Sequence, residues 1–316
     1  MNLSIINAHP RDANIRFQEE GHKYTILTDL NSKYTSCTTW NHSHFAKFDA
    51  DSVITSMMQG KNWNASNKYW GQTADQIKQQ WAASGAAAAK AGTQMHYEIE
   101  CFMQGVGGLR PIGLKTDKHP SGVCPMTPNQ TGMQSPYNQR GLGVLEGLCP
   151  IGLKTDKHPS GVCSTHQDLL NYYNEEELAT LSPHFLKFVK DTPHLVPYRT
   201  EWLIYDDQAK ISGSIDMVYE NPDGSLMIYD WKRCVKIEKT NGFGKWATTE
   251  CISHIPDSNF WHYALQLNTY KTIIERNYGK RVTDLCLVRL HPDSKTYELL
   301  KVPILEDEMR DLFNTR

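Results

Sequence analysis

Two aspartates and one lysine lie close together in an otherwise apolar stretch, GSIDMVYENPDGSLMIYDWK, at residues 213–232. Asp216 and Asp230 each interrupt a run of β-forming residues, and Lys232 follows Asp230 by two positions. Because side chains alternate between the faces of a strand, Asp230 and Lys232 should point to the same face. Carboxylates are costly to bury without a partner, and their oxygens suit Mg²⁺ or Mn²⁺. A lysine beside such an ion could orient a water molecule or stabilise a phosphoryl transition state.

A β-hairpin is needed to position these three residues. Residues 214–219 and 226–231 are apolar and rich in β-forming side chains, which predicts two strands. The Asn-Pro-Asp-Gly sequence at 221–224 predicts the tight turn between them, because Pro presets φ and Gly accepts a positive φ. Two acids and one lysine would then converge on one surface of a sheet. The alternative is a surface hairpin with an ordinary cross-strand Asp–Lys pair.

The spacing resembles the core of the PD-(D/E)XK nuclease superfamily. A G-x-x-D segment at 213–216 precedes a D-x-K segment at 230–232, and D-W-K is a frequent form in the RecB-like and phage-exonuclease branches. Three further pieces occur in the order typical of the superfamily: G-T-x-x-H-x-x-x-E at 92–100, a glutamate at 201 and Q-x-x-x-Y at 266–270.

Two N-terminal pieces resemble viral exonuclease-like members more loosely. They are R-F-x-E-E-x-H-x-Y at 16–24 and S-x-T-T-W at 36–40. The hydroxyls of the second region could donate to a phosphate backbone; they belong to Thr35, Ser36, Thr38 and Thr39. The alternative is the ordinary β-propensity of threonine.

The resemblance implies a metal site. The metal ligands would be His96, Asp216, Asp230 and the carbonyl of Trp231, holding one or two Mg²⁺ or Mn²⁺ ions. Such ions lower the pKa of a water molecule and neutralise charge that develops on the phosphate. Lys232 would position or activate that water. Glu201 would be a supporting acid near the metal; its alternative role is an exposed residue paired with Arg199.

Other matching residues would support the site or contact DNA. Gln266 would support Lys232 or a phosphate, and Tyr270 would contact the DNA strand. Glu100 lies four residues after His96 and shares its helix face, so it is a candidate supporting group or an ordinary helix-surface residue.

A basic stretch follows the D-x-K segment. Arg233 and Lys236 are its first members, and Lys239 and Lys245 continue it beside Phe243 and Trp246. These residues could follow phosphates, with an aromatic ring available to stack on a base. The alternative is a solvated loop.

The remaining elements predict one α/β domain over residues 1–316. Its core would be restriction-endonuclease-like, with a central mixed sheet flanked by helices and an N-terminal hairpin. Predicted β-elements are a hairpin in 14–28, an extended piece at 33–40, and strands at 197–205, 283–290 and 296–304. Predicted helices lie at 51–58, at 73–82, in a further segment that ends at 103, in two stretches between 166 and 193, at 260–275 and from 306 onward.

Residues 105–164 differ from the rest of the chain. They are rich in Gly, Pro, Ser, Thr and Asn, and PIGLKTDKHPSGVC recurs unchanged at 111–124 and 150–163. This composition predicts a low-complexity surface insertion with a duplicated linker. An alternative is a zinc site formed by His119, Cys124, His158 and Cys163.

Composition excludes several classes of protein. The 316 residues carry a net charge of −2, so a nucleic-acid partner would need a local basic groove. The sequence has no apolar run that could span a membrane and no signal-peptide pattern at its start.

Eight cysteines without a C-x-x-C pair predict free thiols inside a cell, in the cytoplasm or, for a viral protein, also the host nucleus. Their spacing does not match the iron–sulfur cluster of some RecB-like nucleases, so no cluster is expected.

The resemblance therefore implies a metal-dependent nuclease that hydrolyses DNA phosphodiester bonds. An exonuclease acting in recombination, repair or replication on linear duplex or single-stranded DNA is favoured by analogy. The alternatives are a non-catalytic nucleic-acid-binding protein on the same fold and a structure-specific endonuclease. A homo-oligomer or a recombination partner protein is also compatible with the sequence.

Overall fold

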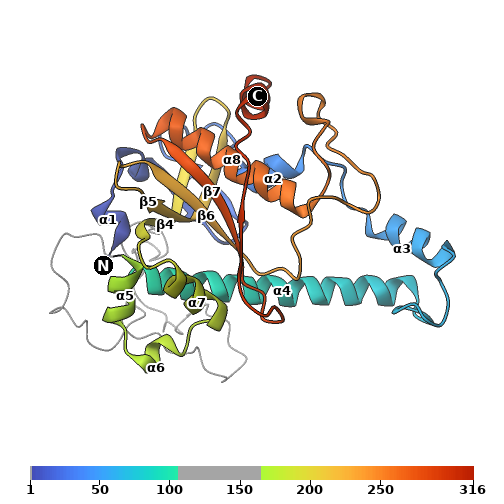
Figure 1. Cartoon of the computed structure of the whole chain (residues 1–316). Coiled ribbons are helices and arrows are strands. Elements are labelled where there is room, and N and C mark those ends of the chain that lie inside the picture. The colour runs from blue at the N-terminus through green and yellow to red at the C-terminus, as the bar shows by residue number, and fades with distance from the viewer. Residues whose placement is uncertain (1, 106–164) are drawn as a thin grey trace, which may run out of the picture.

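The structure is a computed structural model that describes residues 2–105 and 165–316. It is an α/β protein with a mixed central sheet, helices on both faces and an N-terminal hairpin, as predicted (Figure 1). The strands are β1 (Ile15–Gln18), β2 (Lys23–Ile26), β3 (Thr35–Ser36), β4 (Val196–Asp206), β5 (Ile211–Glu220), β6 (Leu226–Lys232), β7 (Val282–Arg289) and β8 (Glu298–Lys301). The helices are α1 (Leu3–Ile6), α2 (Cys37–His42), α3 (Ala50–Gln59), α4 (Ala74–Met103), α5 (His166–Tyr172), α6 (Glu175–Leu178), α7 (Pro183–Asp191), α8 (Asn259–Asn277) and α9 (Glu306–Asn314), with 3₁₀ turns η1 (Pro10–Asn14) and η2 (Glu250–Ile252).

Strand β5 is the centre of the sheet. The antiparallel strand β4 pairs along its length, from Ile211 to Glu220. The opposite edge of β5 is therefore shared by two strands: β3 pairs in parallel at Ile211 and Ser212, and β6 pairs antiparallel from Met217 to Glu220. Residues 213–216 lie between these two ladders. Strands β7 and β8 extend the sheet beyond β6.

The predicted hairpin is confirmed. β5 and β6 are joined through Asn221, whose carbonyl accepts from the amide of Gly224 at 2.9 Å. Gly224 has φ +77°, a left-handed conformation that glycine adopts without a Cβ clash.

Two apolar clusters cover the faces of the sheet. One joins strand residues such as Ile215 and Ile228 to α8, α9 and α2, and the other joins Met217 and Trp231 to α4, α5 and α7. Figure 1 shows α8 on one face and α4 with α5 and α7 on the other. The hairpin of β1 and β2 forms a third, smaller cluster with Tyr205. The sheet is thus buried on both faces, and polar groups inside it need partners.

The extended piece predicted at 33–40 is wrong beyond Ser36. Helix α2 begins there, because the Ser36 hydroxyl accepts from the amide of Thr39 at 3.1 Å and caps the helix. Trp40 is then buried, with its ring edge-on to Phe313 at 5.2 Å.

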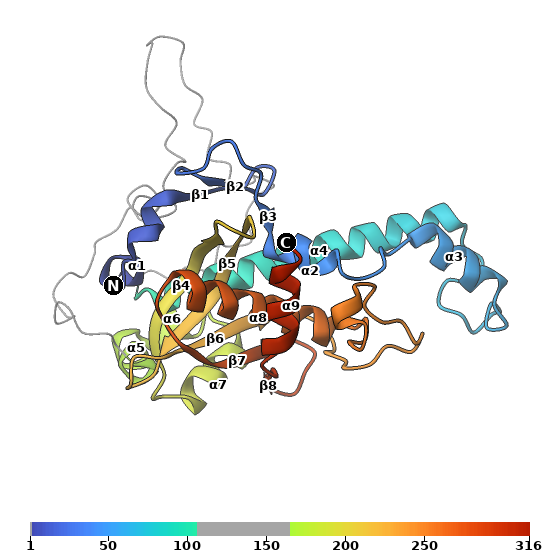
Figure 2. The ribbon, with the colours of Figure 1, turned by 90° about the horizontal axis from the view of Figure 1, so that it is seen from above.

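Helix α4 is continuous over 30 residues, whereas two helical segments were predicted. Thr73 and Gln76 form a capping box at its start. Its last turns pack on the sheet, while its first half projects from the body with α3 beside it (Figures 1 and 2). Strand β8 is also shorter than the predicted 296–304.

The predicted insertion, its repeat and the alternative zinc residues fall at 106–164, outside the described residues, apart from Gly105. Among the described helices, none combines the length and hydrophobicity that a membrane span requires.

Candidate active site

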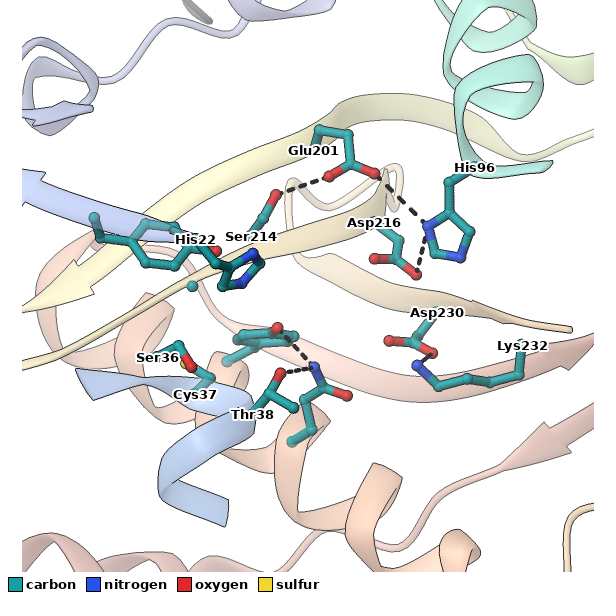
Figure 3. A pocket seen from close by; sticks show the side chains of 14 residues that line it. His22, Ser36, Cys37, Thr38, His96, Glu201, Ser214, Asp216, Asp230 and Lys232 are labelled. Atoms are coloured by element: carbon teal, nitrogen blue, oxygen red, sulfur yellow. Dashed lines mark hydrogen bonds and ion pairs between the residues drawn. The ribbon is translucent and has the colours of Figure 1, made fainter. Parts of the chain in front are cut away.

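A pocket of about 200 Å³ opens where residues 213–216 of β5 lie between β3 and β6. Figure 3 shows side chains from the sheet, α4 and the N-terminal region converging on it. The structure brings nine residues singled out in the sequence to its lining: Ser36, Thr38, His96, Glu201, Asp216, Asp230, Lys232, Gln266 and Tyr270.

Strand register explains why three acids meet. Residues on either side of Glu201 pair with residues on either side of Asp216, so these two acids lie opposite each other on β4 and β5. The last pair between β5 and β6 is Met217 with Tyr229, so the next position along places Asp216 opposite Asp230. Opposite residues of antiparallel strands have neighbouring side chains. Three carboxylates therefore form a row across three adjacent strands.

The ladder between β5 and β6 ends at this row. The backbone amide of Trp231 donates to Oδ2 of Asp216 at 3.0 Å, in place of a backbone acceptor. The Trp231 ring is buried against the edges of Phe185 and Phe188. This packing fixes the β6 backbone and hence the position of the Asp216 carboxylate.

Glu201 has an unusual backbone conformation for a residue in a strand. Its φ is +45°, which is uncommon for any residue other than glycine and concentrates at functional sites. The Ser214 hydroxyl donates to Oε2 of Glu201 at 2.9 Å and holds the carboxylate over the pocket. Arg199, its alternative partner in the sequence analysis, instead donates to Asp12 at 2.7 Å.

His96 faces two of the acids with one nitrogen and the backbone with the other. Nε2 lies 3.1 Å from the carbonyl oxygen of Trp231, which can only accept, so Nε2 carries the hydrogen. Nδ1 lies 3.6 Å from Oδ2 of Asp216 and 3.8 Å from Oε1 of Glu201. A neutral His96 would thus point a lone pair at two carboxylates. The arrangement calls for a cation, either a proton on Nδ1 or a metal ion.

The electrostatics of the pocket agree with this need. Burial acts to lower the pKa of His96, but Asp216 and Glu201 outweigh it and raise the pKa to about 9. Burial raises the pKa of Asp216, and the nearby charges of His96 and Lys232 offset part of that rise. Without a metal, a protonated His96 is the counter-ion of these acids.

Asp230 and Lys232 form an ion pair, with 2.5 Å between Oδ2 and Nζ. Burial raises the pKa of Asp230, partly offset by Lys232. Burial acts to lower the pKa of Lys232, yet Asp230 and Asp216 together raise it above its ordinary value, so the lysine is charged. Nζ also lies 4.6 Å from the centre of the Tyr263 ring on α8, a favourable cation–π contact.

Gln266 and Tyr270 line the α8 side of the pocket. Nε2 of Gln266 donates to the Tyr270 hydroxyl at 2.9 Å and to Oγ1 of Thr38 at 3.2 Å (Figure 3). Tyr270 is only 3% exposed, and its ring packs against Gly213. A Cβ on Gly213 would lie 2.8 Å from that ring and 2.9 Å from Sγ of Cys37. Glycine in the G-x-x-D segment is therefore required by this close approach.

Some singled-out residues lie elsewhere. Glu100 lies outside the pocket lining and accepts from Gln104 at 3.0 Å. Arg233 and the exposed Lys236 lie on the loop that follows β6. The Trp231 carbonyl faces His96. Of the four N-terminal hydroxyl residues, Ser36 and Thr38 line the pocket.

Four lining residues had no role predicted from the sequence. Ser214 orients Glu201, Cys37 packs on Gly213, and His22 and Tyr24 reach the pocket from the N-terminal hairpin. His22 and Tyr24 belong to the R-F-x-E-E-x-H-x-Y piece, so the resemblance of this piece to viral exonuclease-like proteins could have pointed to them.

The donor set fits a divalent cation. Ligand atoms of His96, Glu201 and Asp216 all lie within 4.8 Å of one another. Ligating histidines usually donate their other ring N–H to a carbonyl or carboxylate, as His96 does here to Trp231. The three carboxylates and Lys232 have a formal charge of −2 with a neutral His96, which one divalent cation balances.

Comparisons with models of known protein families and with curated proteins found no match.

Proposed function

We propose that this protein is a divalent-metal-dependent nuclease with a PD-(D/E)XK active site. The observation that carries the proposal is the convergence of Nδ1 of His96 with the carboxylates of Glu201 and Asp216, while Nε2 is held by the carbonyl of Trp231. A divalent cation bound here would replace the proton on Nδ1 of His96 as the counter-ion of both carboxylates. The order of the sequence motifs, which resembles that of the PD-(D/E)XK superfamily, also supports the proposal. The mixed α/β fold is compatible with this resemblance.

His96, Glu201 and Asp216 would hold the metal, with Asp230 beside them. A divalent cation supplies Lewis acidity, which activates water for attack and neutralises charge on the phosphate. Mg²⁺ and Mn²⁺ are the candidates because two of the three ligands are carboxylates.

The protein's own residues would bind and orient the scissile phosphate. Lys232 carries a fixed positive charge next to Asp230 and can stabilise negative charge on a phosphate oxygen. Gln266 would orient the Tyr270 hydroxyl, because its two amide hydrogens already donate to Thr38 and Tyr270; the hydroxyl could then donate its own hydrogen to a phosphate oxygen. Glu201 and Asp216 lie beside His96 of α4, away from Thr38, to which Gln266 donates (Figure 3). A phosphodiester would then lie between acids and donors, and the preference for DNA ends comes from the resemblance alone.

The test is incubation of purified protein with linear and covalently closed circular DNA of the same sequence. With Mg²⁺ or Mn²⁺ we expect shortening of the linear form and survival of the circle, and no cleavage of either form with EDTA. Cleavage of the circle would instead support an endonuclease. Absence of cleavage of both DNA forms under all metal conditions would contradict a deoxyribonuclease.

A further inference from the structure

Two projections of the molecule carry aromatic side chains exposed to solvent. The tip loop, residues 60–72 between α3 and α4, presents Trp70 at 50% exposure. The basic loop, residues 233–249 between β6 and η2, presents Phe243 at 86% and Trp246 at 52% exposure. Aromatic residues are enriched in binding interfaces relative to the rest of a protein surface.

Hydrogen bonds hold both loops in defined conformations. In the tip loop, Nε1 of Trp81 on α4 donates to the Tyr69 hydroxyl at 2.9 Å and fixes the loop to the helix. In the basic loop, Oδ1 of Asn241 accepts from the amides of Phe243 and Lys245, at 3.0 and 2.9 Å. Each loop therefore holds its exposed ring in a defined place.

The charges of both loops are positive in a protein whose net charge is −2. The tip loop contains Lys61 and Lys68, and residues 52–74 contain no acid. The basic loop carries Arg233, Lys236, Lys239 and Lys245 against Glu238 alone. Aromatic rings interspersed with lysines are the surface that single-stranded nucleic acids require, since phosphates follow the cations and bases stack on the rings.

Both loops extend beyond the same end of the sheet in two perpendicular views (Figures 1 and 2). Helix α4 connects the tip loop to the pocket, because it carries both Trp81 and His96. Their separation of fifteen positions corresponds to about 22 Å of helix.

We infer that the tip loop and the basic loop form a two-sided holding surface for a single-stranded nucleic acid that leads into the pocket. This inference rests on the proposed function and adds to it the strandedness of the substrate. Stacking on Trp70, Phe243 and Trp246 requires bases that are not paired and stacked in a duplex.

The experiment measures binding without cleavage, in EDTA. Fluorescence anisotropy of a labelled 20-nucleotide single strand is compared with a blunt duplex of the same sequence. We expect tighter binding of the single strand, and about ten-fold weaker binding by Trp70→Ala and by Phe243→Ala, which is roughly 1.4 kcal/mol each.

The matched control is Leu30→Ala, which removes an equally prominent exposed apolar side chain, 70% exposed, outside both loops. Its affinity should equal that of wild type. Circular dichroism checks that each variant is folded. Trp70→Phe and Trp246→Phe preserve the rings, so they should bind normally but lose part of the tryptophan quenching that the strand causes.

Equal affinity of wild type, Trp70→Ala and Phe243→Ala would overturn the inference, as would a preference for the duplex. The proposed function fails separately. If binding depends on the loops but no cleavage occurs in Mg²⁺ or Mn²⁺, the holding surface stands and the nuclease proposal is rejected. If cleavage occurs and the loop variants bind as wild type does, the nuclease proposal stands and the holding surface is rejected.

Discussion

Nζ of Lys232 lies 2.5 Å from Oδ2 of Asp230, two residues earlier on the same strand, and the Asp230 side chain is only 3% exposed. The pair therefore lies inside the protein, unlike a solvated surface pair. Its position beside Asp216 makes the lysine the one fixed positive charge near the row of acids, among the residues that line the pocket.

Removing the lysine should destabilise the protein. Lys232→Ala leaves the buried Asp230 carboxylate without its counter-ion, so the free energy of unfolding should fall by about 3–5 kcal/mol. Urea denaturation in EDTA measures this loss. The control is Lys301→Ala, which breaks an exposed pair with Asp284 and should change stability little. Equal effects of the two variants would show that Asp230 does not depend on Lys232.

A divalent cation should stabilise the folded protein. Mn²⁺ at one hundred times its Kd adds about 2.7 kcal/mol to the free energy of unfolding, because it binds the folded site alone. The thermal midpoint should therefore rise in wild type and remain unchanged in Asp216→Asn, which lacks a ligand. Asp284→Asn, a substitution outside the pocket, is the control and should respond like wild type. A rise that persists in Asp216→Asn would place the cation elsewhere.

Gly213 should not tolerate a methyl group. Gly213→Ala would place a Cβ 2.8 Å from the Tyr270 ring, and the resulting displacement should cost about 1–3 kcal/mol and disturb the Gln266 contact. Urea denaturation and cleavage rates report the two effects. Gly85→Ala is the matched control: its Cβ would meet nothing within 4 Å, and the helix should gain up to about 1 kcal/mol. Normal stability and cleavage in Gly213→Ala would refute the packing argument.

Acid should weaken the fold through His166. This residue is fully buried between Thr192 and Tyr219, and burial lowers its pKa from 6.5 to about 3. Below pH 6.5 the unfolded chain takes up a proton that the folded protein refuses until about pH 3, so stability falls as the pH falls through that window. Between pH 7 and 5 this contribution is about 2 kcal/mol.

His166→Gln should therefore show a flatter loss of stability from pH 7 to 5 than wild type, in urea titrations at both values. His254→Gln, at an exposed position, should retain the wild-type slope. Identical slopes in wild type and His166→Gln would mean that His166 is protonated in the folded state.

Local signals were enough to predict the hairpin and the shared strand face of Asp230 and Lys232. The Asn-Pro-Asp-Gly turn and the alternation of strand side chains act within a few residues, so they can be read directly. The predicted helix at 73–82 stopped short of Gly85, whereas α4 continues through this glycine. One glycine costs about 1 kcal/mol, which a helix of 30 residues tolerates.

Features that depend on distant segments could not be predicted. The positive φ of Glu201 and its bond from Ser214 require the register of β4 on β5. Trp40 lies in a threonine-rich stretch that favours a strand by propensity, but its burial against Phe313 and the Ser36 cap favour a helix. The approach of Tyr24 to the pocket likewise depends on how the N-terminal hairpin packs.

The most direct test of the account is the rate at which linear DNA is cleaved by wild type and by Asp230→Asn, each with Mn²⁺, Mg²⁺ or EDTA. Asn keeps the shape of the side chain but removes the charge that faces Lys232 and Asp216, and Asp284→Asn controls for loss of an acid elsewhere. We predict metal-dependent cleavage by wild type and Asp284→Asn, and a rate at least about 100-fold lower for a folded Asp230→Asn. Cleavage that continues in EDTA, or that Asp230→Asn retains, would contradict the central claim.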